Sequence, residues 1–148
     1  MRNEQQHPSH GLAPVEPPRR RVLVMDDDPD LRALMTAALR HRSFDVLDAP
    51  DGVRGIEYLD AATRRAPWEL PDLVVSDVLM PGLGGLDLLR AMRAARWTIP
   101  VLLVTAFPEP ALEARARALG AACVLAKPFD METFVATVEQ EAMAIRLG

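Results

Sequence analysis

Short runs of apolar residues alternate along the chain with segments in which apolar residues recur at helical spacing. Five such runs predict strands, and the segments that follow them predict helices. The expected strands cover residues 22–25, 45–47, 73–75, 101–104 and 124–126. Repeated strand-then-helix units are typical of an α/β fold with a parallel sheet.

Three of these runs are apolar throughout, which indicates strands covered by helices on both faces of the sheet. They are the runs at 22–25, 73–75 and 101–104. The run at 45–47 begins with a charged residue and alternates only weakly. We therefore expect that strand at an edge of the sheet.

The helix signals are strongest near the two ends of the pattern. Asp28 is placed to cap a first helix that begins at Pro29. Its apolar stripe consists of Leu31, Leu34, Met35, Ala38 and Leu39. Asp130 is placed to cap the last helix, whose stripe consists of Met131, Phe134, Val135, Val138, Ala142 and Ile145. Further helices are expected at 51–63, 84–96 and 109–119, and the last of these has the fewest apolar residues to bury.

The length of 148 residues and the apolar content of 49% fit one globular domain with an ordinary core. Residues 1–20 contain four of the thirteen prolines and few large apolar side chains, so we expect a flexible extension there and a folded domain at 21–148. His7 and His10 lie in this extension, and we expect them to be solvated rather than bound to a metal.

The net charge of −4 argues against a nucleic-acid-binding protein, which would be basic. The apolar runs are far shorter than the roughly twenty residues of a membrane span, and the N-terminus lacks the apolar segment of a secretory signal. We therefore expect a cytoplasmic protein without a membrane partner. The single cysteine, Cys123, lies in an apolar stretch and is expected to be a small core residue.

Polar side chains follow four of the five predicted strands. Asp26 and Asp27 come directly after the first strand, Asp77 after the third, Thr105 after the fourth and Lys127 after the fifth. The carboxyl ends of parallel strands meet at one edge of a sheet, where such sheets bind ligands. We therefore expect these side chains to converge.

Carboxylates crowded at one edge predict a divalent cation, and Mg²⁺ suits their oxygen donors. Beside the cation, the Thr105 hydroxyl and the Lys127 ammonium form a cradle for a phosphoryl group. Lys127 is the only lysine in a chain with sixteen arginines. Taken singly, each residue has an ordinary alternative, because the acids could cap a helix or a turn and the other two could be solvated loop residues.

Four motifs together resemble the receiver domain of two-component response regulators. They are VLVMDDD at 22–28, DLVVSDVLMPG at 72–82, VTA at 104–106 and KPF at 127–129. The resemblance covers residues 21 to about 147. It implies a flavodoxin-like, doubly wound (βα)5 domain with a five-stranded parallel sheet of strand order 2-1-3-4-5.

The resemblance also implies a role for each polar residue. It places the phosphoacceptor at Asp77 and the metal-binding acid pair at Asp26 and Asp27, with Asp77 and the backbone carbonyl of Leu79 completing the metal shell. The residues expected to sense or bind the phosphoryl group are Thr105, Ala106 and Lys127. A cis peptide bond between Lys127 and Pro128 is expected to aim the ammonium inward.

The function implied is that of a single-domain, chemotaxis-regulator-like response regulator. Asp77 would accept a phosphoryl group, with Mg²⁺, from a phosphohistidine on a sensor kinase or histidine phosphotransfer protein. The output would be binding of a partner protein through the fourth helix, fifth strand and fifth helix of the domain. The protein would be a monomer or weak dimer. It would assist its own phosphotransfer but would not otherwise be an enzyme. Two alternatives stay open: a phosphorylation-independent pseudo-receiver, and a receiver cut from a longer regulator. A hydrolase is disfavoured, because such enzymes need a capping domain for substrate.

Three positions depart from the family pattern. Leu79 and Phe107 stand two residues after Asp77 and Thr105, at sites that flank the attacking water during dephosphorylation. Apolar side chains cannot orient that water, so the sequence predicts a comparatively long-lived aspartyl-phosphate. Val124 replaces the usual aromatic switch residue, so the signal is expected to pass through the fourth helix instead.

Overall fold

A computed structural model describes residues 19–147 of the chain. It contains a five-stranded parallel sheet in the order β2-β1-β3-β4-β5, which confirms the predicted fold class and strand order. The strands are β1 (Arg21–Met25), β2 (Asp45–Ala49), β3 (Leu73–Asp77), β4 (Val101–Thr105) and β5 (Cys123–Ala126). The prediction that the mixed second strand lies at an edge is also confirmed.

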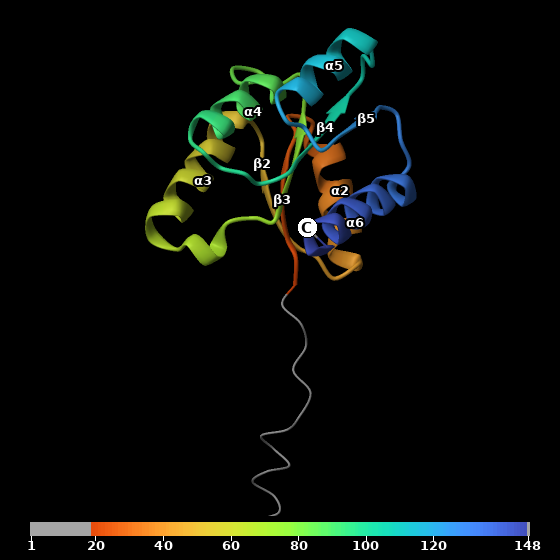
Figure 1. Ribbon diagram of the computed structural model, residues 1–148. Coiled ribbons are helices and arrows are strands. Elements are labelled where there is room, and N and C mark those ends of the chain that lie inside the picture. The colour runs from red at the N-terminus through yellow and green to blue at the C-terminus, as the bar shows by residue number, and fades with distance from the viewer. Residues whose placement is uncertain (1–18, 148) are drawn as a thin grey trace, which may run out of the picture.

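Helices cover both faces of this sheet, as Figure 1 shows. One face is covered by α2 (Pro29–His41) and α6 (Met131–Leu147). The other is covered by α3 (Gly52–Arg65), α4 (Gly85–Ala94) and α5 (Pro110–Ala118). A short 3-10 helix, η2 (Pro67–Glu69), lies between α3 and β3.

The core consists of two apolar layers separated by the sheet. Successive residues of β1 alternate between them: Val22 and Val24 pack with α2 and α6, whereas Leu23 and Met25 pack with α3 and α4. Each fully buried side chain of this kind contributes roughly 1.5–3 kcal/mol relative to an exposed one. β3 and β4 are buried along their whole length, so the central strands form a rigid base for the residues at their ends.

Two central strands extend further than their apolar runs. β3 ends at Asp77, which pairs with Val104, and β4 ends at Thr105, which pairs with Ala126. Ladder hydrogen bonds join backbone groups whatever the side chain, so the polar residues at the ends of the runs stay in register. Asp77 and Thr105 therefore lie on the sheet itself rather than in the loops after it.

Helix α2 begins as the sequence predicts. The Asp28 side chain accepts hydrogen bonds from the backbone nitrogens of Asp30 and Leu31, at 3.0 and 3.3 Å, and Pro29 is the first helical residue. The expected apolar stripe was wrong at Leu34, which is 57% exposed. Thr36 is buried instead, because its hydroxyl donates to the carbonyl oxygen of Arg32.

Helix α5 is the most weakly anchored of the five α-helices, in agreement with its sparse apolar pattern. Ala116 is its one fully buried residue. By contrast, α6 buries Phe134, Val135 and Val138. Its start is capped as predicted, because the Asp130 carboxylate accepts a hydrogen bond from the Thr133 backbone nitrogen and this bond lowers the pKa of Asp130.

The predicted extension at 1–20, with His7 and His10, lies outside the described residues except for Arg19 and Arg20, so the proposed division of the chain stays a prediction. Cys123 is half-buried against the core, and burial raises the pKa of its thiol. Over residues 19–147, the helices are too short or too polar to cross a membrane.

Candidate functional site

The carboxyl ends of β1 and β3 bring three carboxylates together. Asp26 follows the last residue of β1 and is fully buried, and Asp77 ends β3 and is 7% exposed. Asp27 is exposed, and one carboxylate oxygen from each of these three residues lies within 4.8 Å of the other two. We call Asp26, Asp27 and Asp77 the acid cluster. The sequence predicted this convergence from the rule that the carboxyl ends of parallel strands meet at one edge of the sheet.

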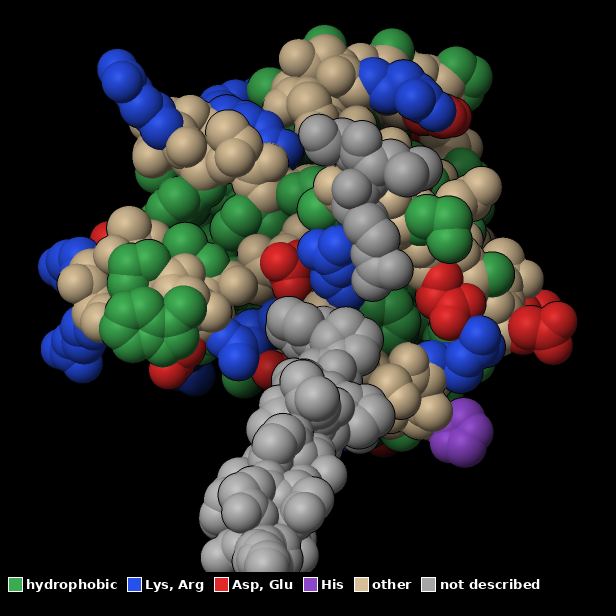
Figure 2. Space-filling view, turned by 60° about the horizontal axis from the view of Figure 1, so that its bottom comes forward, with side chains coloured by type: hydrophobic (Ala, Val, Ile, Leu, Met, Phe, Trp, Pro, Cys, Tyr) green, Lys and Arg blue, Asp and Glu red, His purple; other side chains and the backbone are tan. Residues whose placement is uncertain are grey.

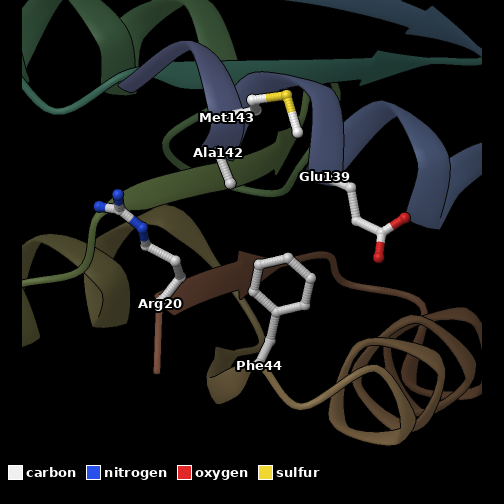
Figure 3. Close-up of a pocket in the computed structure, with 5 residues that line it drawn as sticks. All are labelled: Arg20, Phe44, Glu139, Ala142 and Met143. Atoms are coloured by element: carbon white, nitrogen blue, oxygen red, sulfur yellow. The ribbon is translucent and has the colours of Figure 1, made fainter. Parts of the chain in front are cut away.

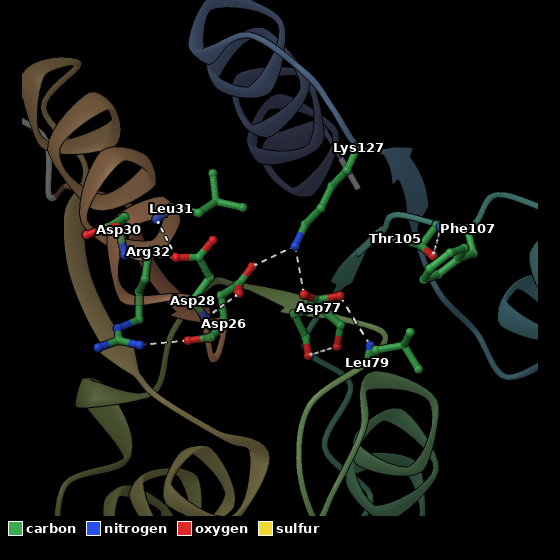
Figure 4. A network of polar contacts seen from close by, with 11 residues as sticks. Asp26, Asp28, Asp30, Leu31, Arg32, Asp77, Leu79, Thr105, Phe107 and Lys127 are labelled. Carbon is green, nitrogen blue, oxygen red and sulfur yellow. Dashed lines mark hydrogen bonds and ion pairs between the residues drawn. The ribbon is translucent and has the colours of Figure 1, made fainter.

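Backbone amides orient the two buried carboxylates. The Asp28 nitrogen donates to Asp26 Oδ1 at 2.9 Å, and the Leu79 nitrogen donates to Asp77 Oδ1 at 3.2 Å. Each bond closes a short turn directly after a strand, so the carboxylate is held by its own loop. The second oxygen of each carboxylate is thereby turned toward the centre of the site (Figure 4).

Lys127 occupies that centre. Its Nζ lies 2.7 Å from Asp77 Oδ2 and 3.3 Å from Asp26 Oδ2 (Figure 4). The Lys127 backbone nitrogen donates to the carbonyl oxygen of Thr105 at 2.7 Å, which continues the β4–β5 ladder up to this residue. The peptide bond between Lys127 and Pro128 is cis, as expected.

Burial and the neighbouring charges shift the ionisation of this group. Burial raises the pKa of Asp26, and the charge of Asp77 raises it further, while the Asp28 amide and Lys127 lower it. Burial acts to lower the pKa of Lys127, but its hydrogen bond to Asp77 and the charges of both carboxylates outweigh this effect, so the pKa is raised. Lys127 is therefore a firmly charged ammonium that offsets part of the repulsion between the acids.

Thr105 lies at the end of β4 and is 1% exposed. Its Oγ1 accepts a hydrogen bond from the Phe107 backbone nitrogen at 3.0 Å, which leaves the hydroxyl proton available for another acceptor. Ala106 is exposed next to it. Val124 is half-buried in β5 and packs against the core layer of α3, α4 and α5.

The mouth of the site is open and partly apolar. Leu79 and Phe107 are 59% and 63% exposed, and together with Thr105 they line a hollow of about 240 Å³. The loop from β3 into α4 stays close to the strand end because Gly85 lies there: a Cβ at this position would be 2.5 Å from the carbonyl oxygen of Asp77.

One further residue of the site was missed by the sequence analysis. Arg32 of α2 donates from Nη1 to the carbonyl oxygen of Asp26 at 2.7 Å and from Nε to Asp48 Oδ2 at 2.8 Å. Asp48 belongs to β2 and Asp26 directly follows β1, so the contact joins a helix to β2 and to the end of β1. A signal existed in the spacing, since Arg32 lies one turn into a helix that begins just after the acid pair, but it is one of sixteen arginines in the chain.

A second hollow, of about 370 Å³, lies near the start of β1 (Figure 3). It is lined by Arg20, Phe44, Glu139, Ala142 and Met143, and Glu139 is paired with Arg42 at 2.9 Å. This lining is largely apolar and lies away from the acid cluster. On the face that Figure 2 presents, basic and acidic side chains are interspersed, so this face is not the basic surface that nucleic acid attracts.

The acid cluster and Lys127 lie at the carboxyl ends of parallel strands, which defines a doubly wound α/β protein with its ligand site at that edge. A family model for the response regulator receiver domain matches residues 22–139. The chain belongs to this family and is the receiver domain of a two-component response regulator. Receiver domains generally bind Mg²⁺ at an acidic pocket, and the oxygen donors of the acid cluster fit such an ion.

Relatives of the chain include full-length regulators and smaller proteins. It is 40% identical over 116 residues to the probable transcriptional regulatory protein TcrX of Mycobacterium tuberculosis, covering 77% of this chain and 46% of TcrX. It is 30% identical over 112 residues to sporulation initiation phosphotransferase F of Bacillus subtilis, covering 76% and 85%. The chain thus spans about half the length of the transcriptional regulators that it matches.

Solved receiver domains have the same fold. The signal receiver domain of the putative response regulator NarL from Mycobacterium tuberculosis superposes with a TM-score of 0.74 and 32% sequence identity. The superposition covers 86% of this chain and 98% of that domain. The expected family and fold are therefore confirmed, whereas the role of each site residue stays a prediction.

Proposed function

We propose that this domain accepts a phosphoryl group on Asp77 from a phosphohistidine of a sensor kinase or histidine phosphotransfer protein. The observation that carries the proposal is the position of Asp77 at the end of β3, with one carboxylate oxygen 2.7 Å from Lys127 Nζ. Thr105, at the end of the neighbouring strand β4, lines the open hollow that we propose as the approach for a donor. The relationship to a protein named a phosphotransferase supports the same chemistry.

The proposed step is an in-line transfer. An Asp77 carboxylate oxygen forms the new bond to phosphorus while the bond from phosphorus to the histidine nitrogen breaks, and the electron pair leaves with the imidazole. Lys127 offsets the negative charge that gathers on Asp77 and on the phosphoryl oxygens. Its ammonium is already in place, so little reorganisation is needed.

Asp26, Asp27 and Asp77 would hold a Mg²⁺ ion, with the backbone carbonyl of Leu79 as a further ligand. When bound, the ion supplies positive charge that screens the carboxylates from each other and from the phosphoryl oxygens. The acids in turn supply a site of hard oxygen donors, which is what this cation prefers.

Thr105 would then report the modification. Its hydroxyl proton can be donated to a phosphoryl oxygen, and a rotation toward that oxygen exchanges the hydrogen bond that Oγ1 accepts from the Phe107 nitrogen. Ala106 lies in the same segment, which leads into α5. Because α5 is weakly anchored and Val124 offers no aromatic ring, we propose that the signal leaves through α5 and reaches a partner on the α5, β5 and α6 surface.

We propose that the output is the binding of a partner protein. The regulator would be a cytoplasmic, single-domain protein, monomeric or weakly dimeric, without further enzymatic activity. The transcriptional regulators that the chain matches, TcrX among them, are longer proteins, and a receiver within such a regulator is the second candidate. The half-length match to these relatives favours it. A pseudo-receiver that binds partners without phosphorylation is favoured only if Leu79 and Phe107 block the mouth.

Incubation with Mg²⁺ and acetyl phosphate, followed by intact-mass measurement, tests the proposal. We expect a gain of one phosphoryl group that Asp77→Asn abolishes. Asp87→Asn is a matched control, because Asp87 is an exposed aspartate of α4 paired with Arg90, and this variant should label like the wild type. No gain in the wild type would favour the pseudo-receiver, and labelling of Asp77→Asn would place the modification elsewhere.

A further inference from the structure

The Arg32 side chain, on α2, donates hydrogen bonds to the loop after β1 and to β2. Its Nη1 donates to the backbone carbonyl oxygen of Asp26 at 2.7 Å, and its Nε donates to Asp48 Oδ2 at 2.8 Å. The side chain is 18% exposed, so these bonds are partly shielded from water. Figure 4 shows the guanidinium on the far side of Asp26 from Lys127.

We propose that Arg32 is a positioning residue that holds the backbone between Asp26 and Asp27 in the orientation that the metal site needs. The inference rests on the proposed function, since it concerns the same acid cluster. Arg32 does not itself belong to the cluster, and it acts through the Asp26 carbonyl.

The planarity of the peptide bond explains how this contact can orient Asp27. The carbonyl of Asp26 shares a rigid plane with the nitrogen and Cα of Asp27. A hydrogen bond that fixes the carbonyl therefore fixes the direction in which Asp27 leaves the loop. The Asp26 nitrogen is already tied to the Ala49 carbonyl oxygen at 3.3 Å, so the peptide groups on both sides of Asp26 are held.

Asp27 needs this support more than the other two acids. Asp26 and Asp77 each receive a backbone amide bond and a contact from Lys127. Within the part of the chain that the structure describes, the Asp27 carboxylate receives neither, and the residue is exposed. Its place in the cluster therefore depends on its backbone, and Arg32 is the side chain that holds that backbone.

The charge of Arg32 is balanced away from the acid cluster. Its guanidinium forms an ion pair with Asp48 of β2, so its positive charge does not need to compete with a cation for the cluster carboxylates. In this respect Arg32 differs from Lys127, whose ammonium pairs directly with the cluster carboxylates of Asp26 and Asp77. Arg32 therefore orients the backbone after Asp26, and its ion pair with Asp48 balances the guanidinium charge that would otherwise oppose cation binding.

The experiment is a Mg²⁺ titration of the unphosphorylated protein, followed by the amide chemical shifts of Asp27 and Leu79. Arg32→Met should weaken Mg²⁺ binding about tenfold, the lower end of the range for residues that support metal ligands. Arg32→Lys should recover part of the loss, because an ammonium can reach one of the two acceptors. The matched control is Arg40→Met: Arg40 also lies on α2 and donates to a β2 carbonyl, that of Val46 at 3.0 Å, but near the other end of the helix.

Arg40→Met should bind Mg²⁺ like the wild type, even if thermal unfolding shows that both methionine variants lose stability. Wild-type affinity in Arg32→Met, an equal loss in Arg40→Met, or a wild type whose shifts do not respond to Mg²⁺ would each overturn the inference. If Arg32→Met does not fold, Arg32→Lys decides the matter by the same titration. We expect a partial loss, because one ammonium cannot hold the Asp26 carbonyl while it pairs with Asp48, and wild-type affinity there would overturn the inference.

Labelling by acetyl phosphate separates this inference from the proposed function. Failure of the proposed function abolishes labelling of Asp77 in the wild type. Failure of the inference leaves labelling intact, with the same dependence on Mg²⁺ concentration in the wild type and in Arg32→Met. The expected result is a shift of that dependence to higher Mg²⁺, with wild-type labelling at saturation.

Discussion

The Lys127 ammonium and the Asp77 carboxylate meet at 2.7 Å although β4 separates their strands in the sheet. The long lysine side chain reaches across the end of β4, where Thr105 lies. Asp77 and Thr105 end β3 and β4, and Lys127 directly follows β5, so the three residues lie at the ends of three neighbouring strands. A group added to the Asp77 carboxylate would therefore lie next to the Lys127 ammonium and the Thr105 hydroxyl, which is hydrogen-bonded to the loop after β4.

Lys127 offsets only part of the repulsion within the acid cluster, which predicts a pH dependence of stability. Burial and the charge of Asp77 raise the pKa of Asp26 above its ordinary value of 3.8. The folded state therefore holds a proton that the unfolded state has lost, and the free energy of unfolding falls as pH rises from about 3.8 through the raised pKa. Above the raised pKa, the buried Asp26 carboxylate is charged in the folded state and this penalty is present in full.

Asp26→Asn should remove this penalty and stabilise the protein at pH 7 by about 0.5–2 kcal/mol. Urea denaturation between pH 4 and pH 7 measures the effect, and the variant should show a flatter pH dependence than the wild type. Asp87→Asn, at an exposed position, should leave the slope unchanged. Equal slopes in the wild type and Asp26→Asn would show that Lys127 cancels the repulsion completely.

Leu79 and Phe107 are expected to set the lifetime of the aspartyl-phosphate. Both side chains are exposed at the mouth of the site, where they can crowd the path of a water molecule but cannot orient it. Leu79→Asn combined with Phe107→Glu should speed dephosphorylation by at least about tenfold, because an amide and a carboxylate can position the attacking water. The decay of the phosphorylated mass after removal of acetyl phosphate gives the rate.

Leu34→Asn is the control for this lifetime. Leu34 is 57% exposed, close to the exposure of Leu79, but it lies on α2 rather than at the mouth. Its replacement should leave the decay unchanged. If the double variant decays at the wild-type rate, the two apolar side chains do not control access of water.

The fold could be predicted largely from the sequence because each central strand contains a continuous apolar run and is followed by a helical pattern. The convergence of Asp26, Asp77 and Lys127 followed from the rule that parallel strands end at one edge. The Arg32 bridge could not be predicted, because it depends on the rotamer of one long side chain among sixteen arginines. Leu34 was misplaced since helical spacing alone does not reveal that Thr36 can be buried by bonding to its own helix.

Thr105→Val should separate phosphorylation from its transmission. Valine has nearly the shape of threonine but cannot accept the hydrogen bond from the Phe107 nitrogen or donate to a phosphoryl oxygen. Because Thr105 is not among the groups that we propose to receive the phosphoryl group or offset its charge, the variant should still be labelled on Asp77 by acetyl phosphate. The amide shifts of α5 that change on phosphorylation of the wild type should no longer change, whereas Thr105→Ser, which keeps the hydroxyl, should retain them. Full transmission in Thr105→Val would mean that the signal reaches α5 by another route, such as the loop between β3 and α4.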